Sequence, residues 1–437
     1  MHRIPLVMAV TSDFAGQTRG KGFPITERDA RLEKGVGWTF TNTMINCWGQ
    51  IPATPWGPLG DLVLVPDAAT EIEVDFGDGS VAERFMLGNI HHMDGRAWDC
   101  CLRSYLGDAV KDLERETGLM LIAAFEHEYH DDSIPDRPGD SYGLDKVRLA
   151  GEFPEAYLYA LRAANAEPDT FLPEFGPNQF EITVEPGRGV AAADRAVIVR
   201  ELAHATARRL GRKVSFSPVV TPGAAGNGVH IHMSFRDRQR QLAAYDADAP
   251  YGVSSVMGSF IAGILRRLPQ IVAITAPSAA SYLRLKPQAW SSTYNNLGFR
   301  DREASIRICP VSDRPGANVA GAFNVEFRAG DAAASPYLQL GILVRAGLEG
   351  IREKLPLPEP TSSDPAAMTD DERAALGVTK LPASLGEALD ALESAEGMRD
   401  LMPGELFDAY LMHKRGELSA LDGLDDDEIC RRYAEVY

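Results

Sequence analysis

The chain has 437 residues, of which 45% are hydrophobic and 24% are charged, an ordinary composition for a folded protein of two or three domains. Its formal net charge is −18 and no stretch is rich in lysine and arginine, which argues against nucleic acid and anionic membranes as partners. The five cysteines form no CxxC pair, the first residues lack signal-peptide features, and no apolar run approaches the length of a membrane span. These features predict a cytoplasmic protein with reduced thiols.

The first hundred residues are predicted to consist mainly of strands and loops, with strand candidates at 61–67 and 70–79. Residues 101–118 then carry apolar side chains at helical spacing and end at a glycine, which predicts a helix. We place a domain boundary at this helix, giving an N-terminal domain at 1–104 and a second domain at 105–437.

After this helix, the apolar run "LMLIAA" leads directly into Glu126 and Glu128, which have one residue between them. In a strand, residues i and i+2 point to the same face, so the two carboxylates would lie side by side. Such a pair repels unless a cation, a proton or water compensates the charge. The pair therefore indicates either a strand that has reached solvent or a metal site.

Three later stretches, 178–186, 228–235 and 323–330, also alternate between apolar and polar residues, which predicts strands with one polar face. A solvated face usually mixes Thr, Ser, Lys and Glu, whereas these faces carry glutamate, histidine and arginine. Glu174 adds another carboxylate, seven positions before Glu181. The polar side chains are Glu181, His230, His232, Ser234, Glu326 and Arg328.

Carboxylates with few imidazoles are ligands that suit hard divalent ions such as Mg²⁺ or Mn²⁺. No Walker loop occurs in the sequence, so bound nucleotide phosphates would have to be held by metals and arginines. Residues 284–307 supply such arginines, although a run of surface charge is an equally good interpretation of that segment alone. Between and beyond these stretches, helices are predicted at 193–211 and from 384 to the C-terminus, a strand at 213–220 and an exposed Pro-rich loop at 356–373.

Taken together, these stretches resemble the glutamine synthetase family. "FEHEYH" resembles that family's E-x-E strand, and "EFGPNQFE" its E-x-G-P-G-Q-x-E segment. "GNGVHIHMS" is similar to N-G-x-G-x-H-x-H-x-S, "RDREASIRI" to R-N-R-S-A-S-I-R-I, and "VEFRAGDAAASPYL" to V-E-F-R-x-P-D-x-x-x-N-P-Y-L. The segments follow the family's order and nearly its spacing over most of the chain.

The resemblance implies an α+β fold with a small β-grasp-like N-terminal domain and a catalytic domain in which helices surround a curved antiparallel sheet. It also implies a homo-oligomer, a dodecamer of stacked rings, with active sites between neighbouring subunits. The implied cofactors are ATP and about two or three Mg²⁺ or Mn²⁺ ions per site. The implied reaction transfers the γ-phosphate of ATP to the side-chain carboxylate of glutamate, and an amine then attacks the γ-glutamyl phosphate.

The same resemblance assigns roles position by position. One metal ion would be held by Glu128, Glu174 and Glu181, and another by Glu126, His230 and Glu326. His232 and Ser234 match positions that contact ATP, and Arg302 and Arg307 match the catalytic arginines on the phosphates and the transferring group. Arg284 and Arg328 match the arginines that hold glutamate, and Gly226 falls in the loop over the glutamate amine.

The sequence departs from the family pattern in the part of the site that would bind ammonium. Thr39 stands where the family has an aspartate that helps to bind ammonium, and Trp290 stands at the glutamate that deprotonates it. Ala225 replaces the usual asparagine beside glutamate, so the sequence leaves open whether the acid substrate is glutamate itself. A cation without a counter-charge or base is neither bound nor activated, so these departures argue against ammonia as the nucleophile.

The sequence therefore leaves three candidate functions. The first is an ATP-dependent ligase that joins glutamate to an organic amine, as in the family branch that makes γ-glutamylamides for amine catabolism. The second is an ammonia-using glutamine synthetase, and the third is a non-catalytic regulatory homologue. Trp290 favours the first and predicts a bulky, apolar or aromatic amine, because an aniline-type amine is already neutral. An alkylamine is the alternative if another carboxylate supplies the base.

Overall fold

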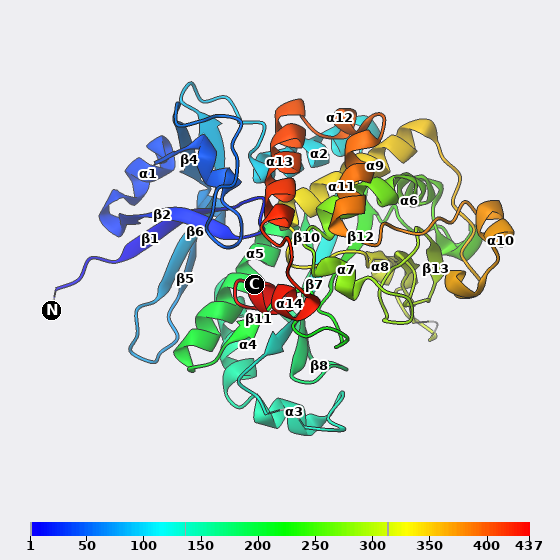
Figure 1. Cartoon of the computed structure of the whole chain (residues 1–437), viewed down its shortest axis with the longest axis horizontal. Coiled ribbons are helices and arrows are strands. Elements are labelled where there is room, and N and C mark those ends of the chain that lie inside the picture. Colours follow the sequence, from blue (N-terminus) through cyan, green and yellow to red (C-terminus); the bar gives the residue numbers. More distant parts are fainter. Residues whose placement is uncertain (1, 136, 313) are drawn as a thin grey trace.

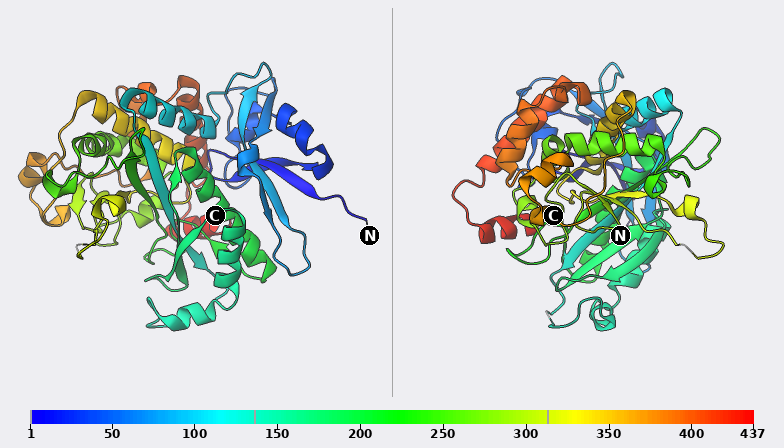
Figure 2. Two further views of the ribbon diagram at one scale, coloured as in Figure 1. Left: turned by 180° about the vertical axis from the view of Figure 1, so that it is seen from behind. Right: turned by 90° about the vertical axis from the view of Figure 1, so that its right-hand side faces the viewer.

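A computed structural model describes residues 2–135, 137–312 and 314–437. The chain forms two sheets that lie in separate regions, the smaller built from the N-terminal residues and the larger from the rest (Figure 1). Seen from behind, the N-terminal sheet stands at one end of the molecule and the N-terminus points away from it (Figure 2). This arrangement agrees with the predicted α+β fold.

The N-terminal sheet has six strands, and its strands β1 and β6 run parallel while the others pair antiparallel. This mixed sheet with the short helix α1 (Arg28–Lys34) beside it is the β-grasp-like domain that was expected. The predicted strand at 61–67 is confirmed, but only the first part of 70–79 is a strand, because the glycines and aspartates after it form turns. The order is β2 (Thr18–Pro24), β1 (Leu6–Ser12), β6 (Glu83–His92), β4 (Leu62–Pro66) and β3 (Val36–Trp38), with β5 (Ile72–Val74) also on β6.

The larger sheet has nine strands, and the long strand β7 (Met120–Asp131) lies near its middle. Most of its pairs are antiparallel as predicted, but β13 and β14 run parallel. The predicted strand at 213–220 shortens to β11, and two residues beyond it the Ser217 N–H donates to the Ser215 hydroxyl at 3.2 Å rather than to a neighbouring strand. The order is β13 (Leu297–Phe299), β14 (Ile306–Ile308), β15 (Val325–Phe327), β12 (Val229–Arg236), β7, β9 (Gln179–Val184) and β8 (Pro168–Pro173), with β10 (Gly187–Arg188) and β11 (Val214–Ser215) also on β7.

Long helices pack together against the larger sheet. The predicted helix at 101–118 is α2 (Leu102–Thr117), and Gly118 ends it in the left-handed conformation with φ 75°. Helix α5 (Val190–Arg209) covers β7, and α9 (Pro336–Glu353) packs against both α2 and α6 (Ser255–Thr275). The remaining helices are α3 (Leu144–Leu149), α4 (Phe153–Ala163), α7 (Ser281–Arg284), α8 (Val319–Ala322), α10 (Asp370–Ala375), α11 (Leu385–Ser394), α12 (Met398–Leu401), α13 (Gly404–Ser419) and α14 (Asp426–Ala434), with short 3₁₀ turns at Ile25–Glu27, Phe40–Met44, Ala68–Thr70, Pro250–Gly252 and Pro365–Ala367.

Two expectations need correction. Helix α6 is long and apolar enough to cross a membrane by length and composition, contrary to the sequence analysis, yet 78% of its most apolar window is buried inside the fold. Its apolar character is therefore explained by packing against other helices. The segment 356–373 is not a plain loop, because Thr369 and Glu372 form a capping box that starts α10.

The crossing of α6 and α9 depends on glycines at the point of contact. A Cβ atom on Gly263 would lie 2.2 Å from the carbonyl oxygen of Ala346 and 2.8 Å from the amide nitrogen of Gly350. Both obstacles are backbone atoms of α9, so no side-chain rotation relieves them. The close approach holds the helix layer that supports the larger sheet.

We expect Gly263→Ala to lower the free energy of unfolding by about 1–3 kcal/mol, because the added methyl overpacks the helix crossing. Gly107→Ala on α2 is the matched control: its Cβ would lie 3.7 Å from Val190, and removing a helical glycine stabilises by up to about 1 kcal/mol. Thermal melting of both variants at one protein concentration tests this. A melting temperature for Gly263→Ala at or above that of the wild type would contradict the packing argument.

Candidate active site

The polar faces of the central strands meet in aligned rows. In the strand register Glu128 lies opposite Glu181 of β9, Glu126 lies opposite His230 of β12, and His232 lies opposite Glu326 of β15. The alternate residues of β7 face the core, as Phe125 and Tyr129 are only 1% and 0% exposed. The predicted common face of Glu126 and Glu128 is therefore confirmed by the burial pattern.

Glu128, Glu174 and Glu181 form the first group of carboxylates. One oxygen from each lies within 4.8 Å of the others, close enough to bind one cation together. Burial, together with the charges of Glu126 and Glu128, raises the pKa of Glu181 to about 10, and burial beside Glu128 also raises the pKa of Glu174. Negative charges this close repel one another, so a bound cation would compensate them, and their hard oxygen donors fit Mg²⁺ or Mn²⁺.

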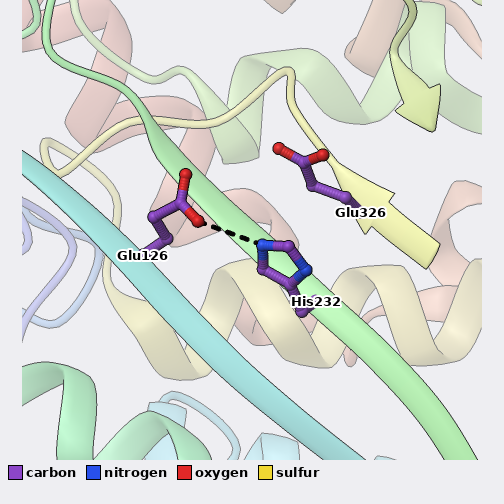
Figure 3. A group of neighbouring side chains, drawn as sticks. All are labelled: Glu126, His232 and Glu326. Carbon is purple, nitrogen blue, oxygen red and sulfur yellow. Dashed lines mark hydrogen bonds and ion pairs between the residues drawn. The ribbon is translucent and has the colours of Figure 1, made fainter. Parts of the chain in front are cut away.

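The second group combines carboxylates with imidazoles. Figure 3 shows Glu126, His232 and Glu326 converging from three strands, and their donor atoms lie within 4.8 Å of one another. His230 is equally close: its Nδ1 lies 2.8 Å from Glu126 Oε1 and 3.4 Å from Glu326 Oε1. Burial alone would raise the pKa of Glu326, but the positive charges around this carboxylate lower its pKa to about 2. His232, assigned from the sequence to ATP, thus lies beside the predicted ligand His230 at this second position.

Arginines surround the second group. Arg307 donates through Nη1 to Glu326 Oε2 at 3.0 Å, and Arg328 pairs with the other oxygen of the same carboxylate. Arg284 is 5% exposed, and its Nη1 is buried without a hydrogen-bond partner among the described residues. A buried guanidinium with a free donor fits an anionic ligand. Arg302 is exposed, and within the described ranges its side chain forms no hydrogen bond.

The loop before β12 fixes the space beside Arg284. The side-chain amide of Gln179 donates to the Gly226 carbonyl at 2.8 Å, and a Cβ on Gly226 would lie 2.6 Å from Arg284 Cγ. Two residues later, the Gly228 N–H donates to Glu128 Oε2 at 2.6 Å. The glycines therefore let the loop touch both the predicted glutamate-binding arginine and the first carboxylate group.

A cavity of about 330 Å³ opens next to the second group. Glu126, His232 and Ser234 line its polar side, and apolar residues of β7 and β12 line much of the rest. Ser234 donates to the Phe323 carbonyl at 2.9 Å, and His232 Nδ1 lies 2.9 Å from Asn324 Oδ1. An apolar cavity that ends at carboxylates and imidazoles fits a nucleotide whose phosphates point toward bound cations.

Trp290 lies beside Arg328 and Phe175 and is exposed. Its side chain is 56% exposed, and its ring centroid lies 6.1 Å from that of Phe175, which follows Glu174. The backbone carbonyl of Trp290 accepts a hydrogen bond from Arg328 Nη2 at 3.3 Å, and the backbone N–H of Trp290 donates to Glu303 Oε1 at 2.8 Å. Trp290 has a φ of 52°, which is strained for a residue with a side chain.

Thr39 does not join this cluster within one chain. It follows β3, which pairs with β4 in the N-terminal sheet, and that sheet lies at the opposite end of the molecule from β13 (Figure 1). Its recorded side-chain contact is with the Thr41 hydroxyl at 3.4 Å. A role for Thr39 in the site would therefore require a second copy of the chain.

Several site residues were missed by the sequence analysis. Lys146 holds the loop after Glu174 by donating to the carbonyls of Glu174 and Gly176 at 2.5 and 2.7 Å. Its position depends on tertiary packing, and nothing in its sequence neighbourhood marks it. Glu303 could have been found, because it and Asp301 are the two acids within the arginine-rich segment 284–307. Other residues that contact the site but were not assigned to it from the sequence are Gln179, Gly228, Asn324 and Phe175.

Comparison with known proteins agrees with this fold. Residues 1–98 match the glutamine synthetase N-terminal domain and residues 99–433 match the glutamine synthetase catalytic domain. A γ-glutamylpolyamine synthetase of Streptomyces coelicolor is 33% identical over 443 residues, covering 97% of this chain and 92% of that protein. A glutamine synthetase of Thermococcus kodakarensis is 30% identical, covering 91% and 86%.

Solved structures agree with these sequence matches. The crystal structure of a "novel glutamine synthase homolog" has a TM-score of 0.92 and 41% identity, covering 100% of this chain and 99% of that one. A structure of GmaS with ADP has a TM-score of 0.82 at 20% identity, covering 99% and 97%, and it supports the fold alone. Matches of this extent, over both domains, show that the chain belongs to the glutamine synthetase family.

Proposed function

We propose that this chain is an ATP-dependent ligase that joins the γ-carboxylate of glutamate to an organic amine through a γ-glutamyl phosphate. The observation that carries the proposal is the contrast between the two halves of the site. The metal and phosphate half has the carboxylates, imidazoles and arginines of phosphoryl transfer, whereas an indole replaces the carboxylate expected in the amine half. The similarity to a γ-glutamylpolyamine synthetase supports the same activity.

The residues divide the work of phosphoryl transfer. Divalent ions held by the two carboxylate groups would neutralise the phosphates of ATP, whose base would fill the cavity beside Ser234. Arg284, with its free buried Nη1, and Arg328 would hold glutamate, and Gly226 would close over the glutamate amine. Arg307 and the exposed Arg302 would stabilise the charge that develops on the transferring phosphoryl group, typically by a few kcal/mol each.

We further propose that the enzyme is a homo-oligomer, a dodecamer, in which Thr39 of one chain faces the site of a neighbour. The distance of the N-terminal sheet from β13 within one chain supports this arrangement, because the two can meet only across an interface. We also propose a cytoplasmic role in amine catabolism. All five cysteines are free and buried, which suits a reducing compartment.

We expect Glu181→Gln to abolish ATP-dependent ligation without unfolding the chain. The raised pKa of Glu181 favours its protonated form in the absence of metal. Glutamine has the shape of that protonated acid, so the metal-free fold should be unaffected. MnCl₂ should stabilise the folded wild type by about 2–4 kcal/mol, because the ion binds the folded chain, and so should raise its melting temperature by several degrees. The melting temperature of the variant should not respond to MnCl₂.

Glu185→Gln is the matched control for this experiment, because Glu185 lies just after the same strand and is exposed. It should keep both the Mn²⁺ response and the activity. Unchanged turnover or an unchanged Mn²⁺ response in Glu181→Gln would remove the metal assignment.

We expect organic amines to be better substrates than ammonium. Phosphate release with ATP and glutamate should be compared for ammonium, methylamine, n-butylamine, spermidine and aniline. Trp290→Ala should reduce kcat/KM for the best organic amine by about 5- to 150-fold, because roughly 1–3 kcal/mol of apolar and aromatic contact is lost. If ammonium is the best substrate of the wild type, an ordinary glutamine synthetase is the better description. If Trp290→Ala leaves the ranking unchanged, Trp290 does not select the amine.

A further inference from the structure

We propose that Glu303 is the carboxylate that binds and deprotonates the amine, and that the amine is a protonated aliphatic amine whose alkyl chain lies on Trp290 and Phe175. The inference rests on the proposed function. It adds the charge class of the amine and the residue that recognises this charge.

Glu303 is joined to the phosphate half of the site by three successive contacts. Its Oε1 accepts a hydrogen bond from the Trp290 N–H at 2.8 Å, and the Trp290 carbonyl accepts one from Arg328 at 3.3 Å. Arg328 in turn pairs with Glu326 of the second metal group. Arg328 also donates through Nε to the carbonyl of Arg302, the residue before Glu303, at 3.0 Å. The carboxylate is therefore held at the edge of the site where the glutamyl phosphate would form.

The Glu303 carboxylate is free to take a ligand. In the part of the chain that the structure describes, its Oε2 has no recorded hydrogen bond and no cationic side chain forms an ion pair with it. Burial raises the pKa of Glu303 and the charges of Asp364 and Asp301 add to this rise, whereas the Trp290 backbone N–H and the charge of Arg328 oppose it. A half-buried anion among other anions is stabilised by an incoming cation. A neutral amine would add no positive charge beside this carboxylate.

Exposed aromatic rings provide the surface beside this charge. Trp290 and Phe175 are 56% and 58% exposed, and their rings meet at 6.1 Å with a 32° angle between planes. Tyr142, 47% exposed, lies near Glu174, whose charge adds to the effect of burial in raising the Tyr142 pKa. Aromatic faces attract both alkyl chains and cations. A carboxylate next to such faces fits an ammonium group with an apolar chain.

The proton balance of the step is simple. The alkylammonium R–NH₃⁺ gives one proton to the Glu303 carboxylate and becomes R–NH₂, whose lone pair attacks the carbonyl carbon of the glutamyl phosphate. The C–N bond forms, the C–O bond to phosphate breaks, and the second amine proton leaves with the phosphate. Glu303 then releases its proton to solvent. A raised carboxyl pKa eases the transfer from an ammonium, whose own pKa is near that of lysine, about 10.4.

The test compares charged and neutral nucleophiles in Glu303→Gln. Glutamine keeps an oxygen that accepts the Trp290 N–H, so the loop is retained while the charge and the base are lost. With ATP and glutamate, kcat/KM for n-butylamine should fall by about 10²-fold or more, whereas values for hydroxylamine and aniline, which are uncharged at neutral pH, should stay within about twofold. Glu303→Asp, which keeps the charge on a shorter side chain, should lose less, and only with n-butylamine.

Asp364→Asn is the matched control, because Asp364 adds to the same negative field and asparagine can still accept the Ala366 N–H. It should leave all the values within about threefold. The inference is overturned if Glu303→Gln spares n-butylamine, if it impairs hydroxylamine equally, or if Asp364→Asn reproduces the loss.

The same assay distinguishes this inference from the proposed function. A wild-type enzyme that forms hydroxamate from hydroxylamine but no amide from n-butylamine would refute the amine class alone. A wild type that forms neither product would refute the ligase activity itself.

Discussion

The site depends on one constraint, the repulsion among its carboxylates. These carboxylates stand on β9, β7 and β15, with the histidines of β12 between β7 and β15. Glu181 and the pair Glu128 and Glu126 lie on the neighbouring strands β9 and β7, and Glu326 lies on β15, beyond β12. The pKa values of Glu181 and Glu326 depart in opposite directions from the ordinary range. At Glu326 arginines and histidines supply the compensating positive charge. At Glu181 no cationic side chain does so among the described residues, and the protein needs either a proton or a metal ion there.

The rest of the fold keeps these charges in register. A shift of one residue in β7 would turn both glutamates into the core and place Phe125 and Tyr129 in the site. The buried face of β7 packs under α5, and α6 and α9 cross with their backbones in close approach. The free energy that holds charged groups near one another thus comes from apolar packing on the opposite face of the same strands.

The sequence was sufficient to predict the features that depend on local periodicity. The polar strand faces, the helix at 102–117 with its Gly118 end, and the common face of Glu126 and Glu128 are all present. Predictions were incomplete where tertiary contacts decide. The parallel pairing of β13 with β14, and the support of the Glu174 loop by Lys146, involve partners far away in the sequence. The apolar helix α6 could be recognised as a core helix only after its neighbours were known.

The two halves of the site are supported in different ways, and this difference bears on how amine selectivity arises. The metal and phosphate residues mostly stand on paired strands, where a substitution also disturbs register and packing. Trp290, Glu303 and Phe175 stand outside the strands, and they contact one another through one hydrogen bond and one ring contact. Exchanging a carboxylate for an indole at 290 therefore leaves the strand pairs intact. A carboxylate at 303, reached through the same backbone N–H, can restore the negative charge at a new position and leave room for an alkyl chain.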